Sequence, residues 1–403
     1  MDVSLASQLE SPLLNSLGSA LDSKPFNYKL EKNFPMLSKN HISVQPVTTP
    51  SGSVYNSNLV IKVPRYGLAY GAAIKVTVTG SAAPTAALTR TSTIGSRFFR
   101  SVSLRTHNRA IQDIWAESTE ARINNSSTEQ NNAYTNMTTP SPALANGTTS
   151  TFYVPLFFFF GESLKSALDA SFVEALEIHL TVNDRTGMWG SSELLFDMNS
   201  LAVQAEMYYI NLENSVQSAL VASQFPLNNN LTMLTNDSYR ETPVSAAYTH
   251  GTTGASMTVE LEAKTNNVIS ASHFMARVKD TNVLLPISSI TMTSSGQTIV
   301  NSDRKTQIFE NSKLSNFVHN VPGSSSGSNM YSVFYGMDSD KTYISGALAM
   351  NGLNAPIYSA VIDSSSLVTA AANATVELVC VHDTATLVSI DSSDGSIQRS
   401  LQN

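Results

Sequence analysis

Short stretches in which apolar and polar residues alternate strictly recur along this chain, and they constrain its fold more than any other feature. A period of two places alternate side chains on opposite faces of an extended strand, so each stretch predicts a β-strand with one buried face. Many such strands with polar connections between them are typical of a β-sandwich or barrel. The alternating stretches lie at 59–63, 74–78, 176–182, 203–209, 257–261 and 376–380.

Helical patterns are few, and two polar stretches at 116–134 and 303–318 are the candidates for short helices. Each follows a candidate hairpin, at 101–115 and 287–300, and each leads into an aromatic strand, at 152–160 and 331–335. Both halves then end on alternating strands, at 202–212 and 375–382. The repeated order predicts an internal duplication of one architecture, with loops of different length.

We therefore expect an all-β chain made of two fused β-sandwiches of about eight strands each, with short helices in loops and a short N-terminal helix. The family resemblance given below implies that both sandwiches are jelly rolls. The expected boundaries are an N-terminal amphipathic segment at 1–25, a first jelly roll at 26–213, a linker at 214–224, a second jelly roll at 225–392 and a C-terminal tail at 393–403.

Four segments resemble the double jelly-roll major capsid proteins, a lineage that includes tectivirus-like phages, adenovirus hexon and polinton-like viruses. Residues 98–117 (FFRSVSLRTHNRAIQDIWAE) resemble the hairpin of the first roll that leads into a helix-bearing loop. The strands at 152–160 (FYVPLFFFF) and 176–184 (LEIHLTVND) are similar to the strand pair that follows it. Residues 331–354 resemble the aromatic strand, polar turn and Ser-Gly strand of the second roll.

What this resemblance implies is a homotrimer of pseudo-hexagonal outline, built from six jelly rolls that stand upright on the surface of an icosahedral virion. The resemblance spans most of the chain in order, although no single motif is specific. The sequence departs from the family at the first hairpin, where Thr106-His107-Asn108 stands in place of the usual Gly-Gly-Gln turn.

Composition and charge narrow the function classes. Charged residues make up 14% of the chain, and the formal net charge is −7. Low charge suits a protein that packs against copies of itself, because charges are costly to desolvate at an interface. No stretch is strongly basic, which argues against direct sequence-specific nucleic acid binding and against genome packaging by a basic arm. The sequence shows no signal peptide and no apolar run long enough to span a membrane.

The sequence contains only weak matches to catalytic or metal-binding motifs. Residues 323–327 match the G-x-S-x-G pattern of a hydrolase, but they lack the apolar strand before and the helix after that a nucleophile elbow needs. The seven histidines form no metal-binding pair at local spacing. The acidic pairs at 338–340 and 391–394 are better explained by turns than by a calcium ion. We therefore expect no catalytic residues, no metal site and no cofactor.

Two apolar features remain. Cys380 lies in a Val- and Leu-rich stretch, which favours a small buried side chain over a nucleophile. The run 157–160 consists of four phenylalanines and predicts a buried strand packed on both faces. Four exposed aromatic residues in a row would invite aggregation, so a membrane or ligand patch is the weaker interpretation.

The N-terminal segment carries apolar residues at near-helical spacing, within about half of a helical wheel. Ser11 and Pro12 suit the start of a helix, and a helix this short needs a partner surface. Either a groove on a neighbouring subunit or an internal membrane could be that partner, and the acidic residues Asp2, Glu10 and Asp22 favour the subunit. The predicted assembly residues, which would contact the capsid interior, are Val3, Leu5, Leu9, Leu13, Leu14, Leu17 and Leu21.

Taken together with the resemblance, these patterns predict a major capsid protein located in the virion. Its expected partners are copies of itself in a homotrimer and in neighbouring capsomers, penton and minor capsid proteins, and an internal membrane if one is present. The alternative functions are a β-sandwich carbohydrate-binding or adhesin-type module and a hydrolase on the same scaffold. An adhesin would need an export signal, and a hydrolase would need convergent titratable residues.

Overall fold

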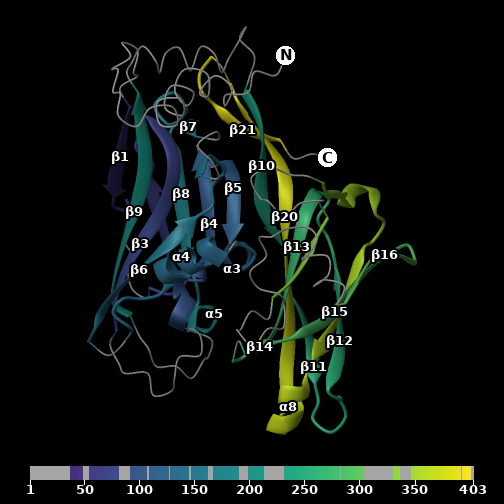
Figure 1. Ribbon diagram of the computed structural model, residues 1–403. Helices are drawn as coiled ribbons and strands as arrows, with labels where there is room; N and C mark the ends of the chain where they lie inside the picture. Colours follow the sequence, from purple (N-terminus) through teal and green to yellow (C-terminus); the bar gives the residue numbers. More distant parts are fainter. Residues whose placement is uncertain are drawn as a thin grey trace, which may run out of the picture.

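The computed structural model describes residues 37–48, 54–80, 91–106, 109–126, 128–144, 147–161, 167–189, 198–212, 231–281, 283–303, 330–335, 346–391 and 393–400. Two β-sandwiches lie side by side in it, as the sequence predicts (Figure 1). The N-terminal segment at 1–25, the linker at 214–224 and most of the second predicted helix lie outside the described residues. Within those ranges, no helix has the length and apolar character needed to cross a membrane.

The first roll consists of two antiparallel sheets packed face to face. One sheet has the strand order β1-β9-β3-β6, with the short β7 also paired to β3, and the other has the order β2-β8-β4-β5. Their bounds are β1 (Leu37–Val44), β2 (Asn58–Lys62), β3 (Leu68–Gly80), β4 (Phe99–Thr106), β5 (Arg109–Trp115), β6 (Thr149–Leu156), β7 (Leu168–Asp169), β8 (Leu176–Val182) and β9 (Met198–Leu212).

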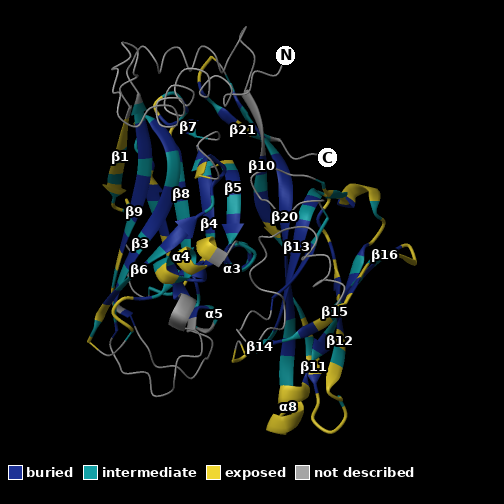
Figure 2. Cartoon of the chain, viewed as in Figure 1, coloured by how far each residue is buried: buried dark blue, intermediate teal, exposed yellow. Residues whose placement is uncertain are grey.

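The alternation seen in the sequence becomes the two faces of these strands. In β8, Leu176, Ile178, Leu180 and Val182 are buried, and the residues between them are partly exposed. Burial of the apolar face against the opposite sheet is the main force that holds such a sandwich together. Figure 2 shows the result as dark strand interiors between lighter outer faces and loops.

The second roll repeats this arrangement. The order β10-β20-β13-β17 faces the order β12-β19-β15-β16, and the shorter β11, β14, β18 and β21 extend the first of these sheets. Their bounds are β10 (Leu231–Arg240), β11 (Val244–Tyr248), β12 (Ser256–Glu262), β13 (Val268–Val278), β14 (Leu284–Leu285), β15 (Ile287–Ser294), β16 (Gln297–Asp303), β17 (Met330–Phe334), β18 (Leu348–Ala349), β19 (Ile357–Asp363), β20 (Ala374–Ile390) and β21 (Ile397–Ser400).

The two rolls match in detail, which confirms the predicted duplication. β3 pairs with β9 and has a register shift between Ala69 and Gly71. β13 pairs with β20 and has its register shift at the corresponding place, between Ile269 and Ala271. Short strands pair beside both shifts, β7 on β3 and β18 on β13. An irregularity conserved between the halves in this way defines which residues correspond.

Helices are short and lie between strands. They are η2 (Thr91–Ser96), α3 (Ala116–Asn124), α4 (Thr128–Thr138), η3 (Phe159–Gly161), α5 (Arg185–Trp189), η6 (Met350–Gly352) and α8 (Ser365–Ala370). The predicted polar helix at 116–134 is thus α3 followed by α4. α3 starts where β5 ends and leans against the second roll (Figure 1).

Two expectations need correction. β6 ends at Leu156, so the phenylalanine run does not continue the strand. Phe158, Phe159 and Phe160 are buried, Phe157 is partly buried, and the run ends in the turn η3. Residues 397–400, within the expected C-terminal tail, form β21, which pairs with β20. The short, polar β21 has no alternation pattern, and it becomes a strand because the long β20 offers it an edge.

Candidate functional site: the junction between the two rolls

Of the sequence-derived candidates, several lie outside the described residues. These are the seven predicted assembly residues from Val3 to Leu21, the G-x-S-x-G stretch at 323–327 and the acidic pair at 338–340. The described residues at 391–396 behave as a turn, because Asp391 accepts hydrogen bonds from the backbone N–H and hydroxyl of Ser393. An extensive polar cluster in the described part of the chain lies elsewhere, between the rolls.

One strand belongs to both hydrophobic cores. The first part of β20 places Val376, Leu378 and Cys380 in the core of the second roll. Its last part places Val388 and Ile390 in the core of the first roll, together with Ile397 of β21. Because a strand is stiff along its length, this continuity ties the two cores into one body.

The edge strand β5 is hydrogen-bonded to residues of β10. The backbone N–H of Asp113 donates to Asp237 at 2.7 Å, and the backbone N–H of Trp115 donates to the hydroxyl of Ser238 at 3.0 Å. Gln112 donates from its side-chain amide to the carbonyl oxygen of Asn236 at 2.6 Å. These contacts satisfy the open edge of a four-stranded sheet, which would otherwise be a site for unwanted strand pairing.

Above this edge, α3 covers the outer face of the second roll's larger sheet. Ala121 packs there in an apolar cluster with Met275, Met330, Val379 and Val381. Although α3 looks polar in sequence, Ala121 is fully buried, because the helix lies between two sandwiches. The small side chain allows the close approach of helix and sheet.

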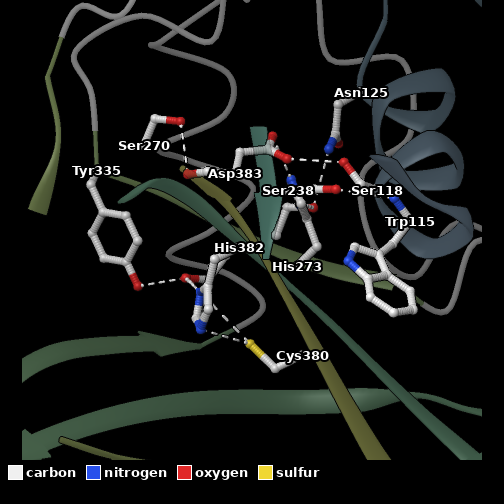
Figure 3. A network of polar contacts seen from close by, with 12 residues as sticks. Trp115, Ser118, Asn125, Ser238, Ser270, His273, Tyr335, Cys380, His382 and Asp383 are labelled. Atoms are coloured by element: carbon white, nitrogen blue, oxygen red, sulfur yellow. Dashed lines mark hydrogen bonds and ion pairs between the residues drawn. The ribbon is translucent and has the colours of Figure 1, made fainter. Parts of the chain in front are cut away.

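A chain of hydrogen bonds connects α3 of the first roll to residues of the second roll (Figure 3). Asn125 of α3 donates to the hydroxyl of Ser332 at 3.1 Å, and that oxygen lies 2.9 Å from Nδ1 of His273. Nε2 of His273 lies 3.0 Å from Asp383, which also accepts a 3.0 Å hydrogen bond from the Ser118 hydroxyl. A buried polar network whose members are partnered fixes one orientation of the parts that it joins.

Ion pairs flank the network. Arg240 of β10 pairs with Glu117 of α3 at 3.1 Å, and Arg399 of β21 pairs with both Asp237 and Asp113. Burial raises the pKa of Asp237 to about 7, although the nearby Arg399 guanidinium and the backbone N–H of Asp113 act in the opposite direction. A carboxyl group that titrates near neutrality therefore lies at the centre of the junction.

Residues 395–397, where β21 begins, are hydrogen-bonded to the first roll. The backbone N–H of Glu174 donates to the carbonyl oxygen of Gly395 at 3.0 Å, and the N–H of Ile397 donates to the Glu174 carboxylate at 2.7 Å. A groove of about 710 Å³ opens beside β21, with Arg109, Lys264 and Arg399 among its lining residues.

A cysteine, a histidine and a glutamate lie close together inside the second roll. Sγ of Cys380 lies 3.6 Å from Nε2 of His382, which in turn lies 3.4 Å from Glu241, but all three side chains are buried. Burial also raises the pKa of the Cys380 thiol well above its usual value, so the thiolate that a nucleophile requires is suppressed. No group of three or more His, Cys, Asp or Glu residues that could hold a metal ion occurs in the described part of the chain.

Sequence reasoning missed the junction. It treated His273 and His382 as scattered residues and assigned Ser118 to a polar helix without a partner. The only signal in the sequence was the position of that helix directly after a hairpin in both halves. Ser118 and Asp383 are 265 positions apart, so no local pattern links them.

A comparison with protein families decides the identity of the first roll. The family model described as the N-terminus of the major capsid protein matches residues 28–212, which cover all nine strands of that roll. The first roll is similar to the N-terminal part of major capsid proteins.

Solved structures agree with this assignment at the level of the fold. The capsid protein of the PBCV-1 virus is 11% identical and superposes with a TM-score of 0.69, with 94% of this chain and 100% of that chain covered. The Faustovirus major capsid protein is 9% identical with a TM-score of 0.56, covering 95% and 97% of the two chains. The mavirus major capsid protein is 10% identical with a TM-score of 0.51, covering 90% of each chain.

The matched share shows that this chain has both rolls of the double jelly-roll fold. A search of the curated proteins finds no match to the chain. The alternative of a carbohydrate-binding or adhesin-type module is not favoured, because both the family model and the similar structures are viral capsid proteins.

Proposed function

We propose that this chain is a major capsid protein, that it forms pseudo-hexameric homotrimers which tile the icosahedral shell of a DNA virus, and that it has no enzymatic activity. The observation that carries the proposal is the junction between the rolls. Two sandwiches with equivalent strand orders are held by one shared strand, β20, and by a buried network. Three such chains present six similar units, which is the number needed to fill a near-hexagonal position.

A rigid junction is needed for this role because errors in the angle between the rolls would accumulate around a ring. The hydrogen bonds from α3 to Asp383, the β5 edge contacts and the ion pair of Arg240 with Glu117 act on different sides of the interface. Together they leave little freedom for the rolls to rotate against each other.

The finer partners belong to the same proposal. Contacts between trimers would continue the shell, while penton and minor capsid proteins would fill its vertices and seams. The N-terminal segment at 1–25 would act as an assembly element at the base of the trimer, toward the capsid interior. Its acidic residues favour a groove on a neighbouring subunit over an internal membrane.

The test is the mass and shape of the purified protein. Light scattering should report three chains of 43.3 kDa each, and negative-stain images should show pseudo-hexagonal particles. A protein that stays monomeric at micromolar concentration would contradict the proposal. Hydrolysis of ester, peptide or glycosidic substrates by the pure trimer would contradict its non-enzymatic part.

A further inference from the structure

A small chamber lies at the place in the junction where two sets of contacts meet. One set joins α3 to β20 through Ser118 and Asp383, and the other joins the edge of β5 to β10 through Asp237 and Ser238. Figure 3 shows Ser118, Ser238 and Asp383 gathered where α3 meets the strands of the second roll. The chamber has a volume of about 20 Å³, and residues of all four elements line it. We call it the junction chamber, and its lining includes Gln112, Ser118, Arg122, Phe157, Asp237 and Asp383.

The junction chamber has the size and the polar lining that a single water molecule needs. A cavity of about 10–15 Å³ or more can hold one water molecule, provided that roughly two to four polar groups surround it. Gln112, Ser118, Asp237 and Asp383 are all buried, so an occupant would be held by protein groups and not by bulk solvent.

Asp237 supplies an acceptor that is still available for a hydrogen bond. Its Oδ1 accepts hydrogen bonds from the backbone N–H groups of Asp113 and Ser238, at 2.7 and 2.9 Å. Its Oδ2 lies beside the guanidinium of Arg399 but accepts no hydrogen bond from the described residues. Buried acceptors are normally satisfied by protein or by ordered water. The junction chamber is where a water molecule could reach this carboxyl group.

Ser118 supplies a second acceptor on the opposite side. Its hydroxyl hydrogen is used in the 3.0 Å hydrogen bond to Asp383, which leaves the lone pairs of the oxygen. A water molecule has two hydrogens to donate, so it can serve Ser118 of the first roll and Asp237 of the second at once.

The charges around the junction chamber favour a neutral occupant. Two of the lining residues, Asp237 and Asp383, carry carboxyl groups, which disfavour an anion. Arg122 also lines it, with its guanidinium carbon 4.6 Å from the centroid of the Phe157 ring, and its charge disfavours a metal ion. The described part of the chain also contains no group of three or more His, Cys, Asp or Glu residues that could hold a metal.

We propose that one water molecule occupies the junction chamber and joins the two rolls by donating hydrogen bonds to Oδ2 of Asp237 and to the hydroxyl oxygen of Ser118. The proposal concerns a single chain and does not depend on the trimer. A bridging water of this kind is nearly as favourable as a direct hydrogen bond. It would couple the contact between α3 and β20 to the contact between β5 and β10, so that the two sets stabilise the same orientation of the rolls.

The first test locates the water. A cryo-electron microscopy map of the purified full-length protein, at a resolution that shows ordered solvent, should contain one peak in the junction chamber. We expect it at hydrogen-bond distances of about 2.6–3.2 Å from oxygen atoms of both Ser118 and Asp237. An empty chamber, or a peak that contacts only one roll, would overturn the proposal. So would a peak at the distances of about 2.0–2.6 Å that are typical of Mg²⁺ or Ca²⁺.

The second test measures the coupling in a double-mutant cycle of Ser118→Ala and Asp237→Asn, followed by denaturant unfolding at one pH. If one water serves both residues, the loss of either weakens its hold on the other. The combined effect on the folding equilibrium constant should then differ from the product of the two single effects by about threefold or more. The loss of the ion pair between Asp237 and Arg399 occurs in both backgrounds and cancels in the cycle.

The control is a cycle of Ser118→Ala with Ser359→Ala, because Ser359 lies at the exposed surface and bonds to Glu260. These two effects should multiply. Effects of Ser118→Ala and Asp237→Asn that also multiply would show that the two sets of contacts act independently, which would contradict a shared water.

Discussion

Ser118 of α3 donates a 3.0 Å hydrogen bond to Asp383 of β20, a residue 265 positions further along the chain. The bond joins a loop helix of the first roll to a central strand of the second. It is buried, and Asp383 also pairs with His273. The orientation of one roll on the other therefore depends in part on polar side chains that come from distant segments of the chain.

The first prediction concerns this bond. Ser118→Ala should destabilise the protein by about 1–3 kcal/mol, because a buried carboxylate oxygen loses a hydrogen-bond donor. Thermal unfolding of the purified protein measures the loss. Ser359→Ala is the control, because Ser359 bonds to Glu260 at the exposed surface, where a substitution should change stability by less than about 0.5 kcal/mol. Equal effects of the two changes would contradict the role assigned to Ser118.

Much of the fold could be predicted from the sequence because the information is local. Alternation marked β8 and β12, and the Ser295-Gly296 turn marked the β15–β16 hairpin, where both residues have positive φ angles of 50° and 78°. The duplication was visible because hairpin, helix and aromatic strand recur in the same order. These features need only neighbours along the chain.

The junction could not be predicted, because its partners come from distant segments. Asp113 and Asp237 look like ordinary polar residues of two strands, and no pattern in the sequence around them indicates that they are partners. Phe159 and Phe160 match the pattern of a strand, but they lie in the turn η3, where the backbone N–H of Phe159 donates to the side-chain oxygen of Gln112 at 2.9 Å. Long-range side-chain bonds of this kind leave no periodic pattern.

The second prediction concerns the attachment of β21. Gly395 has a φ angle of 69°, and a Cβ atom there would collide with the carbonyl oxygen of Phe172 in the first roll. Gly395→Ala should therefore cost more than the ~1–2 kcal/mol of a left-handed backbone alone, and it should speed hydrogen exchange at 397–400. Gly251→Ala is matched, because Gly251 has a φ of 79° with no atom within 4 Å of the added methyl group. Similar losses in both variants would argue against close docking of β21.

The third prediction concerns pH. The pKa of Asp237 is about 7 in the folded protein, against an ordinary value of 3.8, so the folded protein holds a proton that the unfolded chain releases in this range. Stability should therefore fall as pH rises from about 4 to about 7, by up to ~1.4 kcal/mol per pH unit.

Unfolding temperatures measured between pH 4.5 and 8 would test this, with Asp237→Asn expected to remove the slope. Asp391→Asn is the control. Hydrogen bonds from Ser393 lower the pKa of Asp391, so its contribution is lost only as pH falls below its ordinary value of 3.8, outside the tested range. A slope that persists in Asp237→Asn would assign the titration to another group.

The last prediction concerns the N-terminal segment. Deletion of residues 1–24 should leave trimers intact, because we expect the rolls to carry the trimer contacts. Shell assembly should fail or become irregular, since the apolar residues from Val3 to Leu21 would no longer contact a neighbouring subunit. A full-length variant with Leu13→Asp and Leu17→Asp should reproduce the defect. Ser7→Asp and Ser16→Asp add the same charge at positions outside the apolar set and should not reproduce it.

Electron microscopy of assembled particles separates these outcomes, because normal shells from the truncated protein would mean that the segment has no part in assembly. Normal trimers with defective shells would place its role between capsomers, where a weak contact repeated over many copies decides whether the shell closes.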